Sequence, residues 1–303
     1  MDFVAGIDGG GTKTLLLCKD LNGKVLLSTK FGAFNINSIC LDAFLSMLDE
    51  IADTLNDLGN CRFLCIGAAG VSNEQMHLAV NQVLVRRGIL NFSLVGDHEI
   101  ALEGAHKGGP GLAVISGTGS ICFGKDQYGR IERSGGWGHL IGDDGSAYAL
   151  GRDAFSACAK SIDGYGPTTV LVNLLRDKFG LSSRGDIIEY VYSGDKTRVA
   201  EVSKIVGEAY IFDDAVAQSI VRKNAVALAE TALGVSKKLN LECANVALLG
   251  GLIDKDTPFR DEFIAALGRL NGNLKCIAPE LSALEGAVML AEKGFKKSLG
   301  VVV

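Results

Sequence analysis

Proline is scarce in this sequence, with 4 residues among 303, while 48% of the residues are hydrophobic. This composition excludes a proline-rich or disordered chain and indicates a globular protein, long enough for a sizeable core and two domains. No apolar run approaches the roughly 20 residues that a membrane span needs, so no membrane partner is expected. Asp2 and Asp8 interrupt the apolar N-terminal stretch, so that a secretory signal peptide is not expected either.

The sequence also has fewer basic than acidic residues, 30 Lys and Arg against 35 Asp and Glu. The formal net charge is −5 at pH 7, whereas a nucleic-acid partner favours a basic face, so no nucleic acid is expected as a partner. The eight cysteines are scattered, and the closest pair, Cys61 and Cys65, has no histidine or second pair nearby to complete a zinc site. A cytoplasmic protein with reduced thiols is expected. Cys122, which lies close to Thr118 in the chain, is the first candidate for attack by thiol reagents.

Three consecutive glycines, in GIDGGGTKT (6–14), separate two apolar stretches near the N-terminus. In a Rossmann fingerprint the glycines lead directly into a helix, whereas here a short apolar run over 14–20 ends at the turn signal Asn22-Gly23. A Walker A loop is excluded because Thr precedes Lys13 and a strand follows. The sequence therefore predicts a strand–turn–strand hairpin whose backbone N–H groups and Thr hydroxyls wrap phosphates. A glycine-rich turn without a ligand is the alternative.

The glycine hairpin recurs in the second half of the chain at a constant offset, from Gly11 to Gly117. GTKTLLLCKDLNGKV (11–25) matches GTGSICFGKDQYGRI (117–131), and an apolar stretch precedes each copy. Two like hairpins, one in each half, indicate a duplicated α/β unit.

The hydrophobic periodicity predicts the elements of the first half. Three strands, a helix over 41–55, and then a strand, a helix, a strand and a short helix give the order βββαβαβα. The segment GGPG, residues 108–111, marks the end of this half. We expect an N-terminal domain over 1–108, completed by the C-terminal helix 285–303.

The second half restarts with strands near 111–116, 120–126 and 130–134. A strand, a helix, a strand and a helix close the unit. We expect a C-terminal domain over 109–284 that is expanded by helices over about 145–240.

Four segments carry a resemblance to a known superfamily: DGGGTKT (8–14), ISGTGS (115–120), GGWGHLIGDDGSAYALG (135–151) and LLGGL (248–252). The chain resembles the actin, Hsp70 and sugar-kinase superfamily, and more narrowly the mammalian-type N-acetylglucosamine kinases and the BadF/BadG/BcrA/BcrD ATPase family, over nearly its whole length. The resemblance implies an α/β fold of two RNase H-like (actin-like ATPase) domains, with ATP and Mg²⁺ in the cleft between them. It also implies phosphorylation of an amino sugar at the 6-hydroxyl, in amino-sugar salvage or cell-wall recycling, by an expected homodimer.

The resemblance assigns the nucleotide to both glycine hairpins and to the late LLGGL segment. Asp8 would orient Mg²⁺ through its water molecules, and Thr118 and Gly119 would contact the γ-phosphate. The residues implied to bind the nucleotide are Asp8, Gly10, Gly11, Thr12, Lys13, Thr118, Gly119, Gly250 and Gly251.

Asp97 is the candidate catalytic base, because it ends the predicted strand NFSLVGD at a sheet edge where ligands bind in α/β proteins. In the resembled kinases an Asp after this strand receives the proton of the acceptor hydroxyl. The alternative is an Asp that only caps the following helix, 98–106. His98 is a second candidate base, although a surface place in the first helical turn fits it better.

The resemblance places the sugar at the GGWG segment. Trp137, the only tryptophan, lies between two glycines, and aromatic faces suit sugar rings. Asp143 is favoured over Asp144 because its place in GDDG matches the family's GDEG, and backbone amides near Gly136 and Ala147 would serve an N-acetyl group. N-acetylglucosamine, N-acetylmuramic acid and glucosamine all stay open as substrates. The residues implied to bind the sugar are Asn35, Asp97, Gly136, Trp137, Gly138, Asp143 and Ala147.

Two other functions remain as alternatives. A BadF-type ATPase activates a partner enzyme and holds an iron–sulfur cluster through paired cysteines at the start of the second half, where this chain has only Cys122. A sugar-sensing repressor of the ROK group carries an N-terminal helix-turn-helix and a cysteine-rich zinc motif, and this sequence shows neither. At Asp8 the sequence departs from the pattern of the mammalian-type N-acetylglucosamine kinases, which tend to have Glu at this position. The shorter carboxylate is normal in the wider superfamily.

Overall fold

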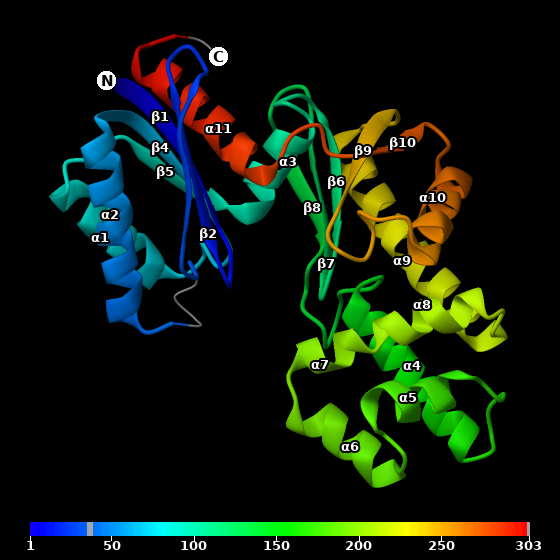
Figure 1. Ribbon diagram of the computed structural model, residues 1–303. Coiled ribbons are helices and arrows are strands. Elements are labelled where there is room, and N and C mark those ends of the chain that lie inside the picture. Colours follow the sequence, from blue (N-terminus) through cyan, green and yellow to red (C-terminus); the bar gives the residue numbers. More distant parts are fainter. Residues whose placement is uncertain (35–38, 302–303) are drawn as a thin grey trace. The chain divides into compact units, whose positions relative to one another are not determined.

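The chain divides into two units, and the computed structural model describes residues 1–34 and 39–301 of it (Figure 1). One unit comprises Met1–Gly109 together with Pro279–Val303, and the other comprises Pro110–Ala278. No helix in this described part of the chain is both long and apolar enough to span a membrane.

The first unit contains a five-stranded sheet with the strand order β3-β2-β1-β4-β5. Strands β1, β2 and β3 pair antiparallel, whereas β1, β4 and β5 pair parallel. The N-terminal half thus has the predicted order βββαβαβα. The elements of this unit are β1 (Asp2–Gly9), β2 (Thr14–Asp20), β3 (Val25–Phe31), α1 (Leu41–Leu58), β4 (Asn60–Ala68), α2 (Glu74–Arg86), β5 (Phe92–Gly96), α3 (Asp97–Ala105) and α11 (Ala283–Ser298).

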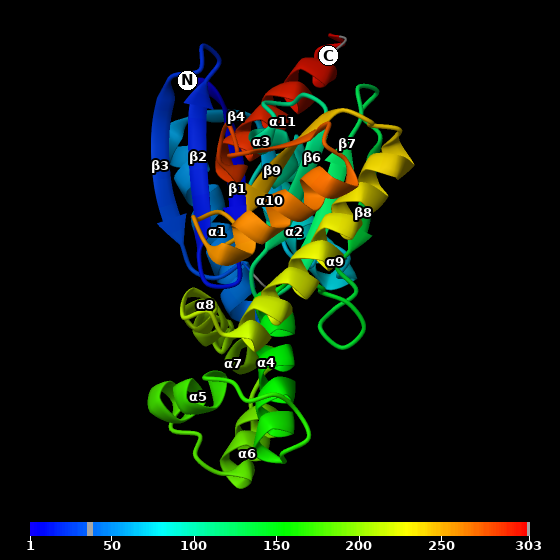
Figure 2. The same ribbon diagram turned by 90° about the vertical axis from the view of Figure 1, so that its right-hand side faces the viewer.

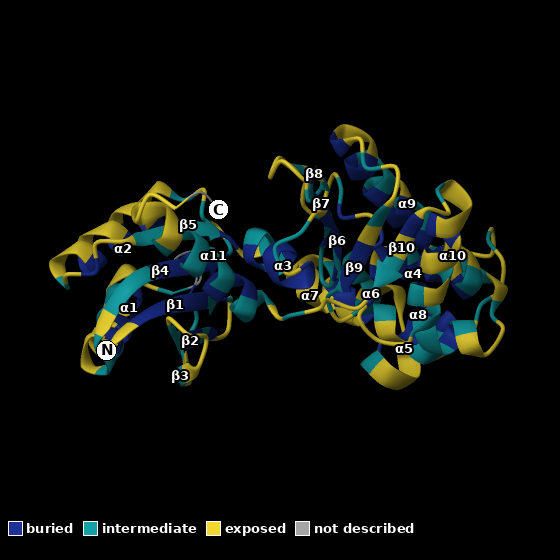
Figure 3. Cartoon of the chain, turned by 90° about the horizontal axis from the view of Figure 1, so that it is seen from above, coloured by how far each residue is buried: buried dark blue, intermediate teal, exposed yellow. Residues whose placement is uncertain are grey.

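Strand β1 is buried along nearly its whole length (Figure 3). Its apolar side chains lie on both faces of the sheet. Phe3, Ala5 and Ile7 point to the core formed with α1 and α2, while Val4 points to the core formed with α3 and α11. At Gly6 a Cβ atom would lie 2.5 Å from the backbone nitrogen of Val288, so α11 packs directly on the strand backbone. Helix α11 belongs wholly to the first unit, whereas the sequence placed the domain boundary after residue 284.

The second unit repeats this architecture, with the strand order β10-β9-β6-β7-β8. Strands β6, β7, β8, β9 and β10 take the places of β1, β2, β3, β4 and β5, which confirms the predicted duplication. The predicted helical expansion corresponds to α4–α9. The elements of this unit are β6 (Gly111–Ser116), β7 (Ser120–Lys125), β8 (Ile131–Gly135), α4 (Ala147–Ile162), α5 (Leu171–Phe179), α6 (Arg184–Ser193), α7 (Lys196–Glu201), α8 (Ser203–Ile211), α9 (Ala215–Leu239), β9 (Ala244–Leu249), α10 (Pro258–Leu270) and β10 (Leu274–Ile277).

The core of the second unit lies between its sheet and the long helix α9. Leu112, Val114 and Cys122 from β6 and β7 pack against buried apolar residues of α9, and α10 lies beside α9 (Figure 2). This packing holds β6, β7 and β9 in place, and with them the loops at the ends of these strands.

The duplication extends to the hydrogen bonds of two turns. In the turn after β2, Oδ1 of Asp20 accepts the N–H groups of Asn22 and Lys24. In the turn after β7, Oδ1 of Asp126 accepts the N–H groups of Tyr128 and Arg130. The two Asp side chains, which the sequence alignment of the halves pairs, therefore close equivalent turns.

Candidate functional site

The first glycine hairpin has the predicted geometry. Its turn is closed by the Gly10 N–H, which donates to the Lys13 carbonyl at 3.0 Å, and β1 and β2 pair antiparallel on either side. A strand and not a helix therefore follows the glycines. The next three residues of the motif, Gly11, Thr12 and Lys13, are exposed, so this turn presents backbone and side-chain donors at the surface of the first unit.

Asp8 and Asp97 lie at the same edge of the first sheet. Asp8 is near the carboxyl end of β1, and Asp97 follows β5, which runs parallel to β1 across β4. Burial raises the pKa of Asp8, the negative charge of Asp97 raises it further, and the charge of Lys13 lowers it. The structure thus brings together three residues that the sequence singled out, and the paired carboxylates favour a positive charge between or beside them.

Asp97 is the first residue of α3, and its Oδ1 accepts the backbone N–H of His98 at 2.9 Å. Gly96 holds the capping position, and its N–H donates to Oε1 of Glu99 at 3.0 Å. The Asp97 side chain is 55% exposed, and the interaction with the His98 side chain lowers its pKa against an opposing effect of burial. This carboxylate is therefore ionised at neutral pH. His98 lies in the first turn of α3, as expected, and its ring folds back over Gly96.

The second glycine hairpin, between β6 and β7, is joined to a later segment of the same unit. The N–H groups of Ala147 and Tyr148 donate to the carbonyls of Gly117 and Thr118, at 2.8 and 3.3 Å. The hydroxyls of Ser116 and Ser120 donate to the carbonyls of Gly145 and Asp144, each at 2.7 Å. The glycine turn 117–119 and the segment 143–148 are thus held together as one structure.

This arrangement corrects one prediction and locates another. The Ala147 N–H is engaged by Gly117, so that it is not available to an N-acetyl group. Asp143 is only 6% exposed, and a Cβ atom at Gly119 would lie 2.8 Å from its Oδ2. The Asp143 carboxylate therefore lies directly over the glycine turn, and Asp144 is exposed.

The late LLGGL segment also closes on this turn. The N–H of Leu252 donates to the Ser116 carbonyl at 3.1 Å, and a Cβ atom at Gly250 would lie 2.5 Å from the same oxygen. The ends of β6 and β9 therefore meet so closely that only glycine fits between them. Gly251, the next residue, faces a cavity.

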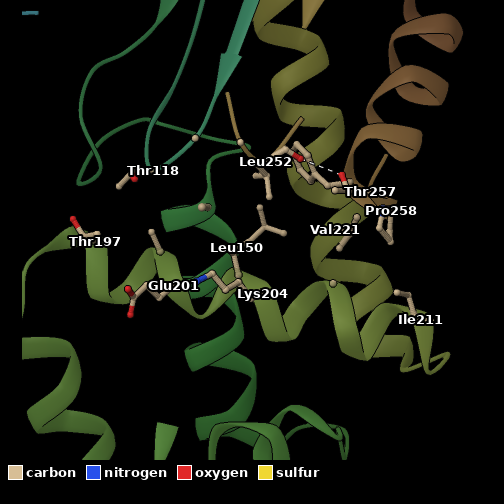
Figure 4. Close-up of a pocket in the computed structure, with 17 residues that line it drawn as sticks. Thr118, Leu150, Thr197, Glu201, Lys204, Ile211, Val221, Leu252, Thr257 and Pro258 are labelled. Atoms are coloured by element: carbon tan, nitrogen blue, oxygen red, sulfur yellow. Dashed lines mark hydrogen bonds between the residues drawn. The ribbon is translucent and has the colours of Figure 1, made fainter. Parts of the chain in front are cut away.

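The cavity has a volume of about 530 Å³ and lies entirely within the second unit. Its size is in the range of small-molecule sites. Figure 4 shows Thr118, Leu252 and Thr257 on the wall formed by the loops at the strand ends, opposite Glu201 and Lys204 on the helical wall. The helical wall also includes Leu150 and Val221. The residues that line it and that the sequence did not single out come mainly from α7 and α8: Thr197, Ala200, Glu201, Ser203, Lys204, Gly207 and Ile211.

The GGWG segment begins where β8 ends. Gly135, Gly136 and Gly138 have φ values of 77°, 68° and 87°, a region that favours glycine, and this explains the composition of the segment. Trp137 between them is 67% exposed, so it presents a large aromatic surface to the solvent. The predicted sugar residue Asn35 lies outside the described residues.

Residues 1–34 and 39–301 contain no group of three or more His, Cys, Asp or Glu side chains arranged to hold a metal ion. Mg²⁺ usually keeps several of its waters and binds through one or two carboxylates together with substrate phosphates. Asp8, a single carboxylate beside the exposed turn 10–13, fits this mode of binding.

The prediction for Cys122 is wrong. Its side chain is fully buried between β7 and the helices of the second unit, and burial raises the pKa of the thiol. A buried thiol with a raised pKa is a poor nucleophile. The exposed cysteines are Cys40 and Cys243.

Comparisons with known proteins place the chain in one family and find amino-sugar kinases among its relatives. The family model of the BadF/BadG/BcrA/BcrD ATPases matches residues 5–291. An N-acetylmuramic acid/N-acetylglucosamine kinase of Clostridium acetobutylicum is 36% identical over 301 residues, covering 96% of this chain and 98% of that protein. An N-acetyl-D-glucosamine kinase of Dictyostelium discoideum is 32% identical over 260 residues, covering 80% of this chain and 81% of that protein. The crystal structure of a Chromobacterium violaceum protein superposes with a TM-score of 0.74 at 25% identity, covering 95% of this chain and 98% of that chain.

Proposed function

Because this chain belongs to the BadF/BadG/BcrA/BcrD ATPase family and its curated relatives are amino-sugar kinases, we propose that it is an ATP-dependent N-acetylhexosamine kinase. It transfers the γ-phosphate of ATP to the 6-hydroxyl of N-acetylglucosamine, N-acetylmuramic acid or both. One observation carries the proposal. Gly117 and Thr118 of the glycine turn line a nucleoside-sized cavity, and the same two residues are hydrogen-bonded to Ala147 and Tyr148 of the 143–148 segment.

The second unit supplies the nucleotide site. The cavity between the strand-end loops and the helices α7 and α8 takes the nucleoside, and Gly251 lets it lie close to the backbone. Thr118 lines the same cavity and contacts the phosphate chain with its hydroxyl and backbone, as glycine-rich turns do in phosphate sites. In this proposal Gly119 and Asp143 lie where the γ-phosphate end meets the sugar.

The first unit supplies the acid–base groups. Asp97 accepts the proton of the attacking hydroxyl, for which an ionised and exposed carboxylate is suited. Asp8, together with the exposed turn 10–13, serves the phosphates. When bound, Mg²⁺ neutralises charge on the phosphate oxygens, and Asp8 is the residue that would hold it through water.

The sugar site is proposed around the GGWG segment. Trp137 offers an exposed aromatic face of the kind that covers the C–H face of a pyranose. Asp143 is buried against the glycine turn at Gly119, where it would orient a sugar hydroxyl.

A coupled assay of ADP release tests the proposal. Mg-ATP is combined with N-acetylglucosamine, N-acetylmuramic acid, glucosamine, N-acetylmannosamine or glucose, and the product is examined by NMR for a phosphate on C6. We expect ADP release that depends on an N-acetylated amino sugar. ADP release that is the same with every sugar and without sugar would instead favour an ATPase that activates a partner enzyme.

A further inference from the structure

Arg133 lies beside the tryptophan of the proposed sugar site. It is exposed on β8, the edge strand of the second sheet, and its guanidinium carbon is 5.7 Å from the centre of the Trp137 ring. A planar guanidinium near an aromatic ring is attracted to it and is held in place by it. The strand therefore presents an oriented positive charge next to the indole.

This charge has no acidic partner in the protein. Within residues 1–34 and 39–301, no carboxylate lies within ion-pair distance of the Arg133 side chain. Arg130, three residues earlier, differs in this respect, because its Nε lies 3.5 Å from Oδ2 of Asp126. An oriented and unpaired guanidinium is suited to a carboxylate of a ligand, which it can bind through two parallel N–H groups.

The chain path relates this pair to the reacting end of the sugar. Trp137 lies on the segment that continues to Asp143 and Ala147, and these contact the glycine turn 117–119. In the proposed function the 6-hydroxyl lies at that turn. In a pyranose ring C2 lies opposite C5, the atom that carries C6, and C3 is next to C2. The C2 and C3 substituents therefore leave the ring on the side turned from the 6-hydroxyl, which is where the proposed function puts the exposed Trp137 and Arg133.

We propose that Arg133, held against Trp137, forms an anion subsite that binds a carboxylate carried by the amino sugar, as in the 3-O-lactyl ether of N-acetylmuramic acid. This inference rests on the proposed kinase function and names the substrate class within it, an acidic amino sugar. Trp137 covers the sugar ring on one face, while Arg133 pairs with the carboxylate beside it. Since Arg stays charged at any working pH, the subsite selects for the ionised acid.

The test compares three sugars in the full-length enzyme: N-acetylglucosamine, N-acetylmuramic acid and the uncharged carboxamide of N-acetylmuramic acid. We expect Arg133→Met to lower the ratio of kcat/KM for the acid to kcat/KM for its carboxamide by about tenfold, because the charged pair is lost while the bulk of the substrate is unchanged. Arg133→Lys keeps the charge without the planar fork and should retain part of the preference. Arg130→Met, which removes a positive charge from the same region, should leave the ratio as it is in the wild type.

Two outcomes would overturn the subsite and leave the kinase proposal intact. One is a wild-type enzyme that phosphorylates N-acetylglucosamine but not N-acetylmuramic acid. The other is an Arg133→Met variant that keeps the wild-type ratio for acid and carboxamide. If no sugar stimulates ADP release, the proposed function fails first, and the subsite fails with it. Thermal unfolding of each variant verifies that the fold is retained.

Discussion

Asp97 combines a local hydrogen bond with an exposed carboxylate. Gly96 holds the N-cap position of α3 and its N–H is satisfied by Glu99, while one Asp97 oxygen accepts the N–H of His98. Its pKa is lowered through His98, and it shares a sheet edge with Asp8. A carboxylate in this position is accessible to a substrate and ionised when the substrate arrives.

The substitution Asp97→Asn should therefore reduce kcat by about 10²–10⁴-fold, the range expected when a general base is removed. Binding of ATP and of sugar should persist, because the amide has nearly the same size and the helix keeps its cap. Steady-state kinetics and calorimetric titration of both ligands measure these two effects. A variant with near-normal kcat would exclude Asp97 as the proton acceptor.

Gly6 is a residue whose missing side chain determines packing. Gly6→Ala would place a Cβ atom 2.5 Å from the Val288 nitrogen, so we expect a loss of about 1–3 kcal/mol in the free energy of unfolding. Gly268→Ala in α10 is the matched control. Nothing lies within 4 Å of a Cβ atom there, and alanine favours a helix over glycine by about 0.5–1 kcal/mol. Urea denaturation should show opposite signs for the two variants.

At the scale of elements, α1 and α2 are joined by a charged contact. Asp49 on α1 lies 2.7 Å from Nη2 of Arg86 and 2.8 Å from Nε of Arg87, at the end of α2. These hydrogen bonds hold the pKa of Asp49 below its ordinary value. Since the folded pKa is lowered, the contribution to stability is present above the unfolded pKa of an Asp and is lost as the pH falls through the folded pKa.

Asp49→Asn should accordingly be less stable than the wild type by about 1 kcal/mol at pH 7, as for a contact near the surface. The difference between the two proteins should shrink as the pH falls below the usual range of an Asp. Urea denaturation from pH 7 to pH 3 measures it. Asp57→Asn, on the same helix, is the control, because Asp57 has no ion pair in the described part of the chain. A constant difference across this pH range would contradict the account.

Elements also show what the sequence could and could not predict. The two glycine hairpins were predictable because the turn residues repeat at fixed spacing, and Asp20 and Asp126 form the same hydrogen bonds. The helical wall of the cavity was not predictable, since residues such as Glu201 and Lys204 come from short helices whose sequence has no motif. The engagement of the Ala147 N–H could not be predicted either, because it depends on a tertiary contact. Its partner, the Gly117 carbonyl, lies thirty residues away, and no local pattern reports that contact.

At the scale of the whole molecule, the second unit is one continuous stretch with its own core and its own cavity. We expect a fragment comprising residues 110–278 to fold and to bind Mg-ATP or Mg-ADP, because every residue that lines the cavity lies within it. Calorimetric titration and the nucleotide-dependent rise in melting temperature measure this binding, with the full-length protein as the reference. A folded fragment without nucleotide affinity would show that the cavity does not bind the nucleotide without the first unit, and would contradict this prediction.

The first unit, by contrast, is made from both ends of the chain. Val4 and Cys65 on one face of its sheet, and Ile100 of α3, pack against Ala287, Val288 and Ala291 of α11. During synthesis, residues 110–278 leave the ribosome before α11 does, so the second unit can complete its core while the first still exposes an apolar face. The two units therefore complete their cores in the opposite order to that in which their first residues are synthesised. The unit whose synthesis begins first is the last to complete its core, and its apolar face stays open until α11 has been made.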